Sequence, residues 1–446
     1  MPTGTDQVLD FILGFNWESA GEAVHRQAAR CLLDSLGALL AGGATPLGAL
    51  SARLAARHMP ATPEERCTLV AGGTASLLGA AFANGFASNA LDVEHGYRPA
   101  QGRPGSCLLP VLCALAETSP GPVRGADFLA ALVIGYEVAI RAGLLRHTDE
   151  RNVFTTGAWA SLGAVAAGGR LLGLTRGELR QALGAADYHS PLGLILRGVE
   201  TPCMAKDGVG WGAFTAMSSL LLAREGFTAP EPLFTGDRAD AVVADLGRTF
   251  RFSGLYFKPY CSCRWTHAAI DGALALLDGH HLAAKDLERV RVRTFRHAAA
   301  LSREAPEDTE HAQYNLTYPL AAALVDGRVD AAQVLPPRLT DPEILRLQSR
   351  IEVEVCAEFD AQFPERTISE VLVTAGGRTW SSGPREPRWE AGDAPTDAVL
   401  EEKFLRLVEP VLGAGAARKL AHAALHLAQS PDCRPLLRDL PLPGHP

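Results

Sequence analysis

The first half of the chain, from residue 5 to about 230, repeats apolar residues at helical spacing. Segments such as 23–42, AVHRQAARCLLDSLGALLAG, and 109–119, LPVLCALAETS, place alanine, leucine and glycine on several faces. This spacing predicts buried or amphipathic helices, and the small residues predict close contacts between them. Because nothing in this half alternates as a half-buried strand does, we expect a large all-helical domain.

The pattern changes near residue 250, where apolar and polar residues begin to alternate. A period of two predicts half-buried strands, and helical segments lie between them. The expected strands are 289–295, 350–359 and 368–377. We therefore predict a mainly α fold. Its expected parts are a helical domain over residues 1–258, an inserted smaller α/β lid domain over 259–395, and helices in 396–446 that return to the helical domain.

Composition narrows the range of partners. A chain of 446 residues favours two domains, and a formal net charge of −8 argues against binding to nucleic acid. Asp6 and Asp10 stand where a signal peptide would need basic and apolar residues. No stretch has the roughly 20 apolar residues of a membrane span, and nine cysteines, an odd number, do not suggest a disulfide framework. We expect a cytoplasmic protein that binds neither nucleic acid nor membrane.

Lysine is rare, so a lysine in an apolar setting is informative. Burial can lower the pKa of a lysine and make it a base or an acid, which arginine cannot readily become. Of 42 basic residues, five are lysines: Lys206, Lys258, Lys285, Lys403 and Lys419. Lys206 lies among small residues in TPCMAKDGVGWGA and is a candidate for such chemistry. A solvated lysine is the alternative.

The segment 254–271, GLYFKPYCSCRWTHAAID, concentrates ionisable side chains. His267 falls in the first turn of a predicted helix and can transfer protons near neutral pH, while Arg264 can pair with a carboxylate. A histidine packed in the core is the alternative. Cys261 and Cys263 could hold zinc, but no second pair is apparent, so we interpret them as structural thiols.

A second cluster, NALDVEHGYRPAQGRPGS, spans residues 89–106. Asp92 and His95 are three apart, so a helical turn would place them on one face, and Arg103 follows in a loop rich in glycine and proline. A solvated loop explains these charges as well.

No metal site or nucleotide site is predicted. His422 and His426 have a spacing that could ligate metal, but no third ligand is suggested nearby, so we interpret them as packing residues. The segment GVGWG lacks the full dinucleotide-binding pattern and follows no strand.

Seven segments carry a combined signal in a fixed order. They are CLLDSLGALLAG, ANGFASNALDVE, RPGSCLLPVLCALAE, TTGAWASLGAVAAGGRLLGL, MAKDGVGWGAFTAMSSLLLAREGFT, KPYCSCRWTHAAID and AQYNLTYPLAAALVDGRV. Together, from about residue 5 to 430, the chain resembles the MmgE/PrpD family. This family includes 2-methylcitrate dehydratases, cis-aconitate decarboxylases and iminodisuccinate epimerases.

The resemblance implies a homodimer without an organic cofactor, and an active site in the cleft between the domains. By motif position, the implied catalytic residues are Asp92, Lys206, His267 and Tyr318. The candidate substrate-binding residues are His95, Arg103, Phe154, Tyr260 and Arg264.

The chain departs from the family pattern at two positions. Arg103 and Phe154 stand where the family usually has histidines. A permanent cation and an aromatic ring there favour a ligand with a carboxylate at one end and an apolar part at the other. We therefore expect a substrate other than 2-methylcitrate.

The resemblance implies a cofactor-independent lyase, either a dehydratase or a decarboxylase, acting by acid–base chemistry at the carbon next to a carboxylate of a small carboxylic acid. One alternative is an epimerase or isomerase of a small dicarboxylate that forms the same enolate-like intermediate. A non-catalytic binding protein of the same fold is the other.

Overall fold

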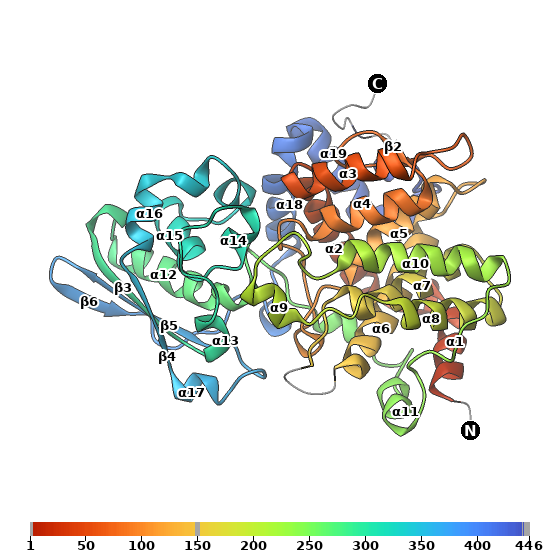
Figure 1. Cartoon of the computed structure of the whole chain (residues 1–446), viewed down its shortest axis with the longest axis horizontal. Helices are drawn as coiled ribbons and strands as arrows, with labels where there is room; N and C mark the ends of the chain where they lie inside the picture. Colours follow the sequence, from red (N-terminus) through yellow and green to blue (C-terminus); the bar gives the residue numbers. More distant parts are fainter. Residues whose placement is uncertain (1–2, 148–151, 439, 441–446) are drawn as a thin grey trace.

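The protein folds into two lobes of unequal size in a computed structural model, which describes residues 3–147, 152–438 and 440. Figure 1 shows a larger helical lobe on the right and a smaller lobe with a sheet on the left. The structure confirms the predicted fold class, because most elements are helices and a small mixed sheet lies in the C-terminal region.

The larger lobe is built from helices of both chain ends. These are α1 (Gly4–Gly14), α2 (Glu22–Gly43), α3 (Pro46–His58), α4 (Leu77–Asn89), α5 (Gly105–Glu117), α6 (Gly125–Arg146), α7 (Gly157–Leu171), α8 (Arg176–His189), α9 (Ile195–Glu200), α10 (Val209–Arg224), α11 (Asp237–Val243), α18 (Asp397–Leu412), α19 (Ala414–Leu425) and α20 (Pro435–Arg438). A hairpin of β1 (Cys67–Thr68) and β2 (Thr74–Ala75) interrupts them. The expectation of an all-helical domain missed this hairpin, because two-residue strands are too short to show alternation.

Small residues let these helices approach closely, as the sequence predicts. A Cβ atom on Gly163 of α7 would lie 2.4 Å from the carbonyl oxygen of Gly135 on α6. Such a contact is too short for any larger residue, so the two backbones pack directly on one another. Capping residues fix where helices begin: the Thr175 side chain accepts from the Glu178 amide at the start of α8, and the Glu178 carboxylate accepts from the Thr175 amide.

The helix α6 is the one described helix long and apolar enough to cross a membrane. It is almost wholly buried inside the larger lobe. Its buried Glu137 and Arg141 form an ion pair, and Arg141 also pairs with Asp245 at 2.7 Å. The length and apolar composition of α6 are therefore those of a helix in the core of the larger lobe.

The smaller lobe packs helices on a four-stranded sheet with the order β4-β3-β5-β6. Its strands are β3 (Leu287–Thr294), β4 (Ile351–Val355), β5 (Ser369–Ala375) and β6 (Arg378–Ser381). β3 and β5 confirm the predicted strands 289–295 and 368–377, whereas β4 confirms only the first half of 350–359, because α17 (Ala357–Asp360) follows it. β3 pairs with β4 in parallel and with β5 antiparallel. Its helices are α12 (His267–His280), α13 (Arg296–Ala299), α14 (Thr309–Gln313), α15 (Thr317–Asp326), α16 (Pro342–Gln348) and α17 (Ala357–Asp360). The helix α12 packs between β5 and α15.

The last long helices pack on the larger lobe. Both α18 and α19 pack against α2 of the larger lobe and against each other (Figure 1). The domain boundaries expected at residues 258 and 395 stay a prediction.

Candidate active site

A cavity of about 70 Å³ lies where the two lobes meet. Both lobes line it: Asp92 and Asp207 come from the larger lobe, and Arg264 and Tyr314 from the smaller one. Its charged lining residues are Asp92, Arg98, Arg103, Asp207, Arg264 and Glu390. Three of the nine candidate site residues, Asp92, Arg103 and Arg264, therefore line this cavity.

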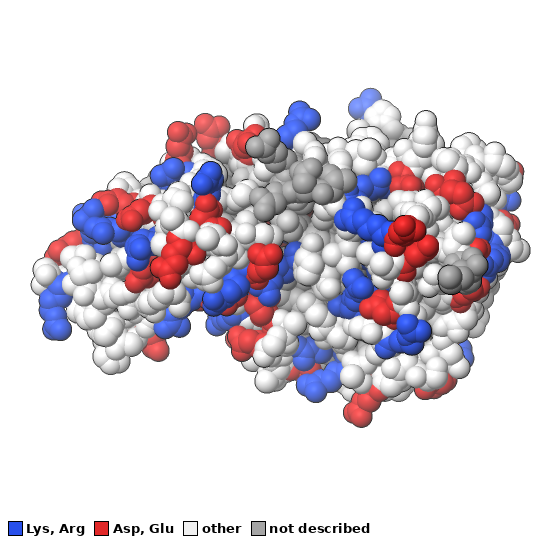
Figure 2. Space-filling view, turned by 90° about the horizontal axis from the view of Figure 1, so that it is seen from below, with Lys and Arg blue, Asp and Glu red and all other residues white. Residues whose placement is uncertain are grey.

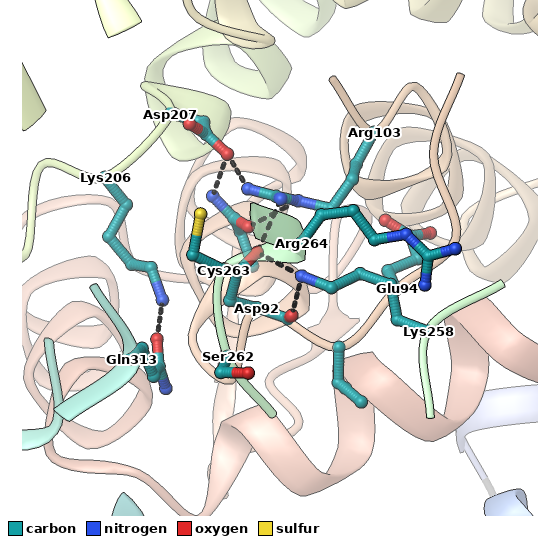
Figure 3. Close-up of polar contacts among 12 residues, drawn as sticks. Asp92, Glu94, Arg103, Lys206, Asp207, Lys258, Ser262, Cys263, Arg264 and Gln313 are labelled. Carbon is teal, nitrogen blue, oxygen red and sulfur yellow. Dashed lines mark hydrogen bonds and ion pairs between the residues drawn. The ribbon is translucent and has the colours of Figure 1, made fainter. Parts of the chain in front are cut away.

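Asp92 lies at the centre of the charged residues that line the cavity. The helix α4 ends at Asn89, and Asp92 follows with a left-handed backbone (φ 50°), so Asp92 and His95 do not share a helical face as expected. The carboxylate Oδ1 lies 2.5 Å from Arg103 and 2.9 Å from Lys258 (Figure 3). Burial raises the pKa of Asp92, but these cations outweigh it and the net pKa is lowered. Asp92 is therefore a carboxylate at neutral pH.

Neither carboxylate oxygen of Asp92 has a hydrogen-bond partner among the described residues, but Oδ1 has two ion pairs instead. The Oδ2 atom is buried and makes no hydrogen bond to any residue that the structure describes. A buried carboxylate oxygen without a donor is unfavourable unless a ligand supplies one. This oxygen is therefore available to a substrate.

Arg103 bridges two acidic residues. It comes from the loop before α5 and forms ion pairs with Asp92 and Asp207, and its Nε donates to the side-chain oxygen of Asn89 at 3.2 Å. Figure 3 shows its guanidinium between Asp207 and Asp92. The planar fork of arginine suits this bridging position.

Lys206 lies beside the cavity and does not line it. It is buried, and its Nζ donates to the side-chain oxygen of Gln313 and, at 2.8 Å, to the carbonyl of Ala90. Burial lowers the pKa of Lys206 to about 8. The solvated alternative is therefore wrong, and the next residue, Asp207, is the one that reaches the cavity.

Sequence reasoning did not select Lys258 as a site residue. It is fully buried and donates to the carbonyl of Asp92 as well as pairing with its carboxylate. Burial lowers its pKa to about 8. The rarity of lysine was the one signal in the sequence that could have selected it.

His267 supports Arg264 in this structure. His267 begins α12, as predicted, and is fully buried. Its Nδ1 accepts from Arg264 at 3.2 Å and its Nε2 donates to the carbonyl of Ser262 at 3.1 Å. Burial, followed by the charge of Arg264, holds the pKa of His267 well below its usual value, so the ring is neutral. The Arg264 guanidinium also forms an ion pair with Glu390 at 2.9 Å.

The two tyrosines of AQYNLTYP have different surroundings. The Tyr318 hydroxyl is buried in the smaller lobe and donates to the carbonyls of Gln333 and Arg338. Tyr314, which the sequence did not single out, lines the cavity, with the Lys206 ammonium 5.8 Å from its ring. Burial raises the pKa of Tyr314, so its hydroxyl stays protonated.

Three other candidates lie away from the cavity. His95 is fully buried between the carboxylate of Asp34, at 2.9 Å, and the hydroxyl of Tyr136, at 2.8 Å. The backbone of Phe154 pairs with Leu194. Tyr260 donates to Asp271 at 2.7 Å and lines an outer cleft of about 750 Å³.

The outer cleft and the cavity share two lining residues, Arg98 and Glu390. Arg98 of the larger lobe lies 3.6 Å from Glu390 and 3.7 Å from Glu386 in the smaller lobe. These ion pairs therefore connect the lobes at the boundary between cleft and cavity.

Cysteines and the remaining histidines form no cluster of metal ligands. Within residues 3–147, 152–438 and 440, no three His, Cys, Asp or Glu side chains gather as a metal site would require. Cys261 and Cys263 are buried free thiols, and burial raises the pKa of Cys263 to about 11. The rings of His422 and His426 stack at 4.2 Å.

The chain is similar to known proteins over most of its length. Human cis-aconitate decarboxylase is 27% identical over 82% of this chain and 80% of its own length. The cis-aconitate decarboxylase-like protein oryM of Aspergillus oryzae is 25% identical over 93% of this chain and 92% of its own length. A model of the MmgE/PrpD N-terminal domain matches residues 6–252, and one of the MmgE/PrpD C-terminal domain matches residues 260–429. The two matches span both lobes, and the chain belongs to the MmgE/PrpD family.

Proposed function

We propose that this protein is a cofactor-independent lyase, a dehydratase or decarboxylase, that acts on a small carboxylic acid at the carbon next to its carboxylate. The observation that carries the proposal is the buried Asp92, whose Oδ1 forms ion pairs with Arg103 and Lys258 while its Oδ2 has no hydrogen-bond partner among the described residues. The distant similarity to cis-aconitate decarboxylases supports a lyase and leaves the substrate open.

The proposed base is Asp92. Its lowered pKa keeps it ionised, so its free oxygen can remove a proton from the carbon next to the substrate carboxylate. The electron pair moves toward that carboxylate, where the cations Arg103 and Lys258 stabilise the developing negative charge. In a dehydration the hydroxyl group on the next carbon then leaves and takes a proton, forming water.

The proposed acid is Tyr314. Burial raises its pKa, and it lies on the cavity wall, so it can donate a proton to the leaving hydroxyl group. In a decarboxylation no proton is removed first. The bond to the carboxyl carbon breaks, carbon dioxide leaves, the electron pair of that bond stays on the remaining carbon, and Tyr314 donates its proton there. His267 and Lys206 act as supports of Arg264 and of the Ala90 carbonyl in this scheme.

Proton NMR in deuterated water tests the reaction class. A panel of 2- and 3-hydroxy acids and unsaturated acids is incubated with the enzyme, and we expect a product that has lost water or carbon dioxide. Asp92→Asn should reduce turnover about 10²- to 10⁴-fold, whereas Asp286→Asn, at an exposed position, should not. Deuterium exchange into an acid of unchanged composition would instead indicate an epimerase or isomerase. Absence of any turnover or exchange would indicate a binding protein.

We also propose a cytoplasmic homodimer that binds neither nucleic acid nor membrane. The face in Figure 2 mixes basic and acidic residues, without an extended basic patch among the described residues on that face. Trp211 of α10 is 52% exposed and packs edge-on against Phe82 of α4, with ring centroids 5.1 Å apart. A large aromatic residue exposed within an aromatic cluster supports a protein interface there.

A further inference from the structure

The cavity has an apolar part of its lining that no motif of the sequence indicated. The larger lobe contributes Ile195 and Val199 of α9, and the smaller lobe contributes Trp265, Phe363 and Pro364. The aromatic wall is held in place, because the Trp265 and Phe363 rings lie 6.0 Å apart and Phe363 stacks on Phe295 at 4.8 Å. A pre-formed apolar wall favours a ligand with an apolar group.

The charged residues that line the cavity already balance one another. Three arginines and three acidic residues line the cavity, so the formal charges of its lining cancel. Each guanidinium faces an acidic partner: Arg103 pairs with Asp92 and Asp207, and both Arg98 and Arg264 pair with Glu390. Behind this lining lie the two lysines, Lys206 and Lys258, each with a pKa lowered to about 8.

This balance limits how many carboxylates a ligand can bring. A tricarboxylate would place three negative charges in a space whose lining is neutral, and the two lysines behind this lining can offset at most two of them. Burying charges without partners is costly. A single carboxylate needs one cation, which Lys258 or an arginine released from its acidic partner supplies.

The volume of the cavity also favours a small ligand. The cavity measures about 70 Å³, roughly half of the 150 Å³ that holds a benzene molecule in another protein interior. Its two apolar walls belong to different lobes, so a larger ligand requires the lobes to separate.

We propose that the substrate is a small carboxylic acid with one carboxylate and an apolar substituent, and that Ile195, Val199, Trp265 and Phe363 determine this specificity. The inference rests on the proposed function and assigns the substrate class of that site. It differs from the expectation drawn from Phe154, because the aromatic wall comes from Trp265 and Phe363, and Phe154 does not line the cavity.

Binding calorimetry tests the inference without relying on turnover. The probes are propionate and isovalerate with one carboxylate, succinate with two, and tricarballylate with three. We expect the monocarboxylates to bind at least about tenfold more tightly than tricarballylate, a difference of about 1.4 kcal/mol. Tricarballylate binding as tightly as isovalerate would overturn the inference, and so would failure of all four acids to bind.

A cation introduced among the apolar lining residues should change the relative affinities for these acids. Phe363→Arg is expected to reduce the preference for isovalerate over succinate at least tenfold. Val355→Arg, at a 47% exposed position in the same lobe, is the matched control and should leave it unchanged. If Phe363→Arg does not fold, Ile195→Lys adds a cation from the larger lobe. An unchanged preference in a folded variant contradicts the assigned wall. Turnover of tricarboxylates alone would support the lyase proposal and refute the proposed specificity. Binding of monocarboxylates without turnover would support the specificity and refute the lyase proposal.

Discussion

The carboxylate of Asp34 on α2 lies 2.5 Å from the Nζ of Lys403 on α18, and both residues hold the backbone that carries Asp92. Lys403 donates to the carbonyl of Val93 at 2.7 Å, and Asp34 accepts from the amide of His95 at 2.8 Å. The side chains of Asp34 and Lys403 are 0% and 2% exposed. A helix near the C-terminal end of the described chain thus fixes the loop at the centre of the candidate site.

Removing one member of this buried pair should destabilise the protein strongly. Lys403→Met leaves the Asp34 carboxylate buried without its ammonium partner, and we expect a loss of about 3–5 kcal/mol in the free energy of unfolding. Denaturant unfolding followed by circular dichroism measures this loss. Lys419→Met on the exposed face of α19 is the control. The double variant Asp34→Asn/Lys403→Met should recover part of the loss, because the Asp34 carboxylate is then no longer buried without its ammonium partner. A single variant as stable as the control contradicts the prediction.

Arg103→Lys should impair the site although it keeps the charge. Lysine is a point charge and cannot bridge Asp92 and Asp207 as the planar guanidinium does. We expect kcat/KM for the substrate found by NMR to fall about 10- to 100-fold, a loss of roughly 1.4–2.7 kcal/mol in transition-state stabilisation. Arg296→Lys, whose side chain is 76% exposed, controls for the exchange itself. Equal kcat/KM values in the two variants would show that the bridge is dispensable.

Trp211→Arg should prevent dimerisation without unfolding the protein. A charge in place of the exposed indole is unfavourable in an apolar interface and tolerated in water. Light scattering should give twice the 47.3 kDa chain mass for the native protein and the single chain mass for the variant. Leu13→Arg, at a 39% exposed position on α1, should remain dimeric. A monomeric native protein would refute the homodimer, and a dimeric Trp211→Arg variant would place the interface elsewhere.

The sequence predicted those elements whose periodicity reflects burial on one face. The strand β5 alternates buried and partly buried residues along its whole length, and this alternation was visible in the sequence. The hairpin β1–β2 was not, because each strand has two residues. Close helix packing was also predictable, since it follows from small residues such as Gly163.

The candidate site was predictable as a set of segments, and much less as a set of side chains. The segments were identified by charge and motif, but the direction of each side chain depends on the backbone between helices. Lys206 has a left-handed backbone (φ 43°), and it is the adjacent Asp207 that lines the cavity. Tyr314 and Tyr318 are four apart, yet α14 ends at Gln313 and α15 begins at Thr317. This break gives them different partners.

Activity should decline in alkaline solution because two buried lysines lose their charge. Burial lowers the pKa of Lys206 and of Lys258 to about 8, so both ammonium groups deprotonate above that pH. Lys258 pairs with Asp92, and its neutral form no longer stabilises negative charge in the cavity. We expect kcat/KM to fall above about pH 8, and the decline to move to higher pH in Lys258→Arg, because arginine stays charged. Lys285→Arg, at an exposed position, should leave the profile unchanged.

The same lysines should affect stability in the opposite direction. Their pKa is lower in the folded protein than the usual value of 10.5, so the unfolded chain binds more protons between about pH 8 and 10.5. Their contribution to the free energy of unfolding therefore rises with pH across this window. The difference in unfolding free energy between native protein and Lys258→Arg, measured at pH 7.5 and 9.5 by denaturant titration, isolates this contribution. At pH 9.5 the free energy of unfolding of the native protein should have risen relative to that of Lys258→Arg. The reason is that the arginine remains a buried charge while Lys258 becomes neutral. A difference that does not change with pH would mean that Lys258 keeps its charge, and the alkaline decline in activity would then need another titrating group.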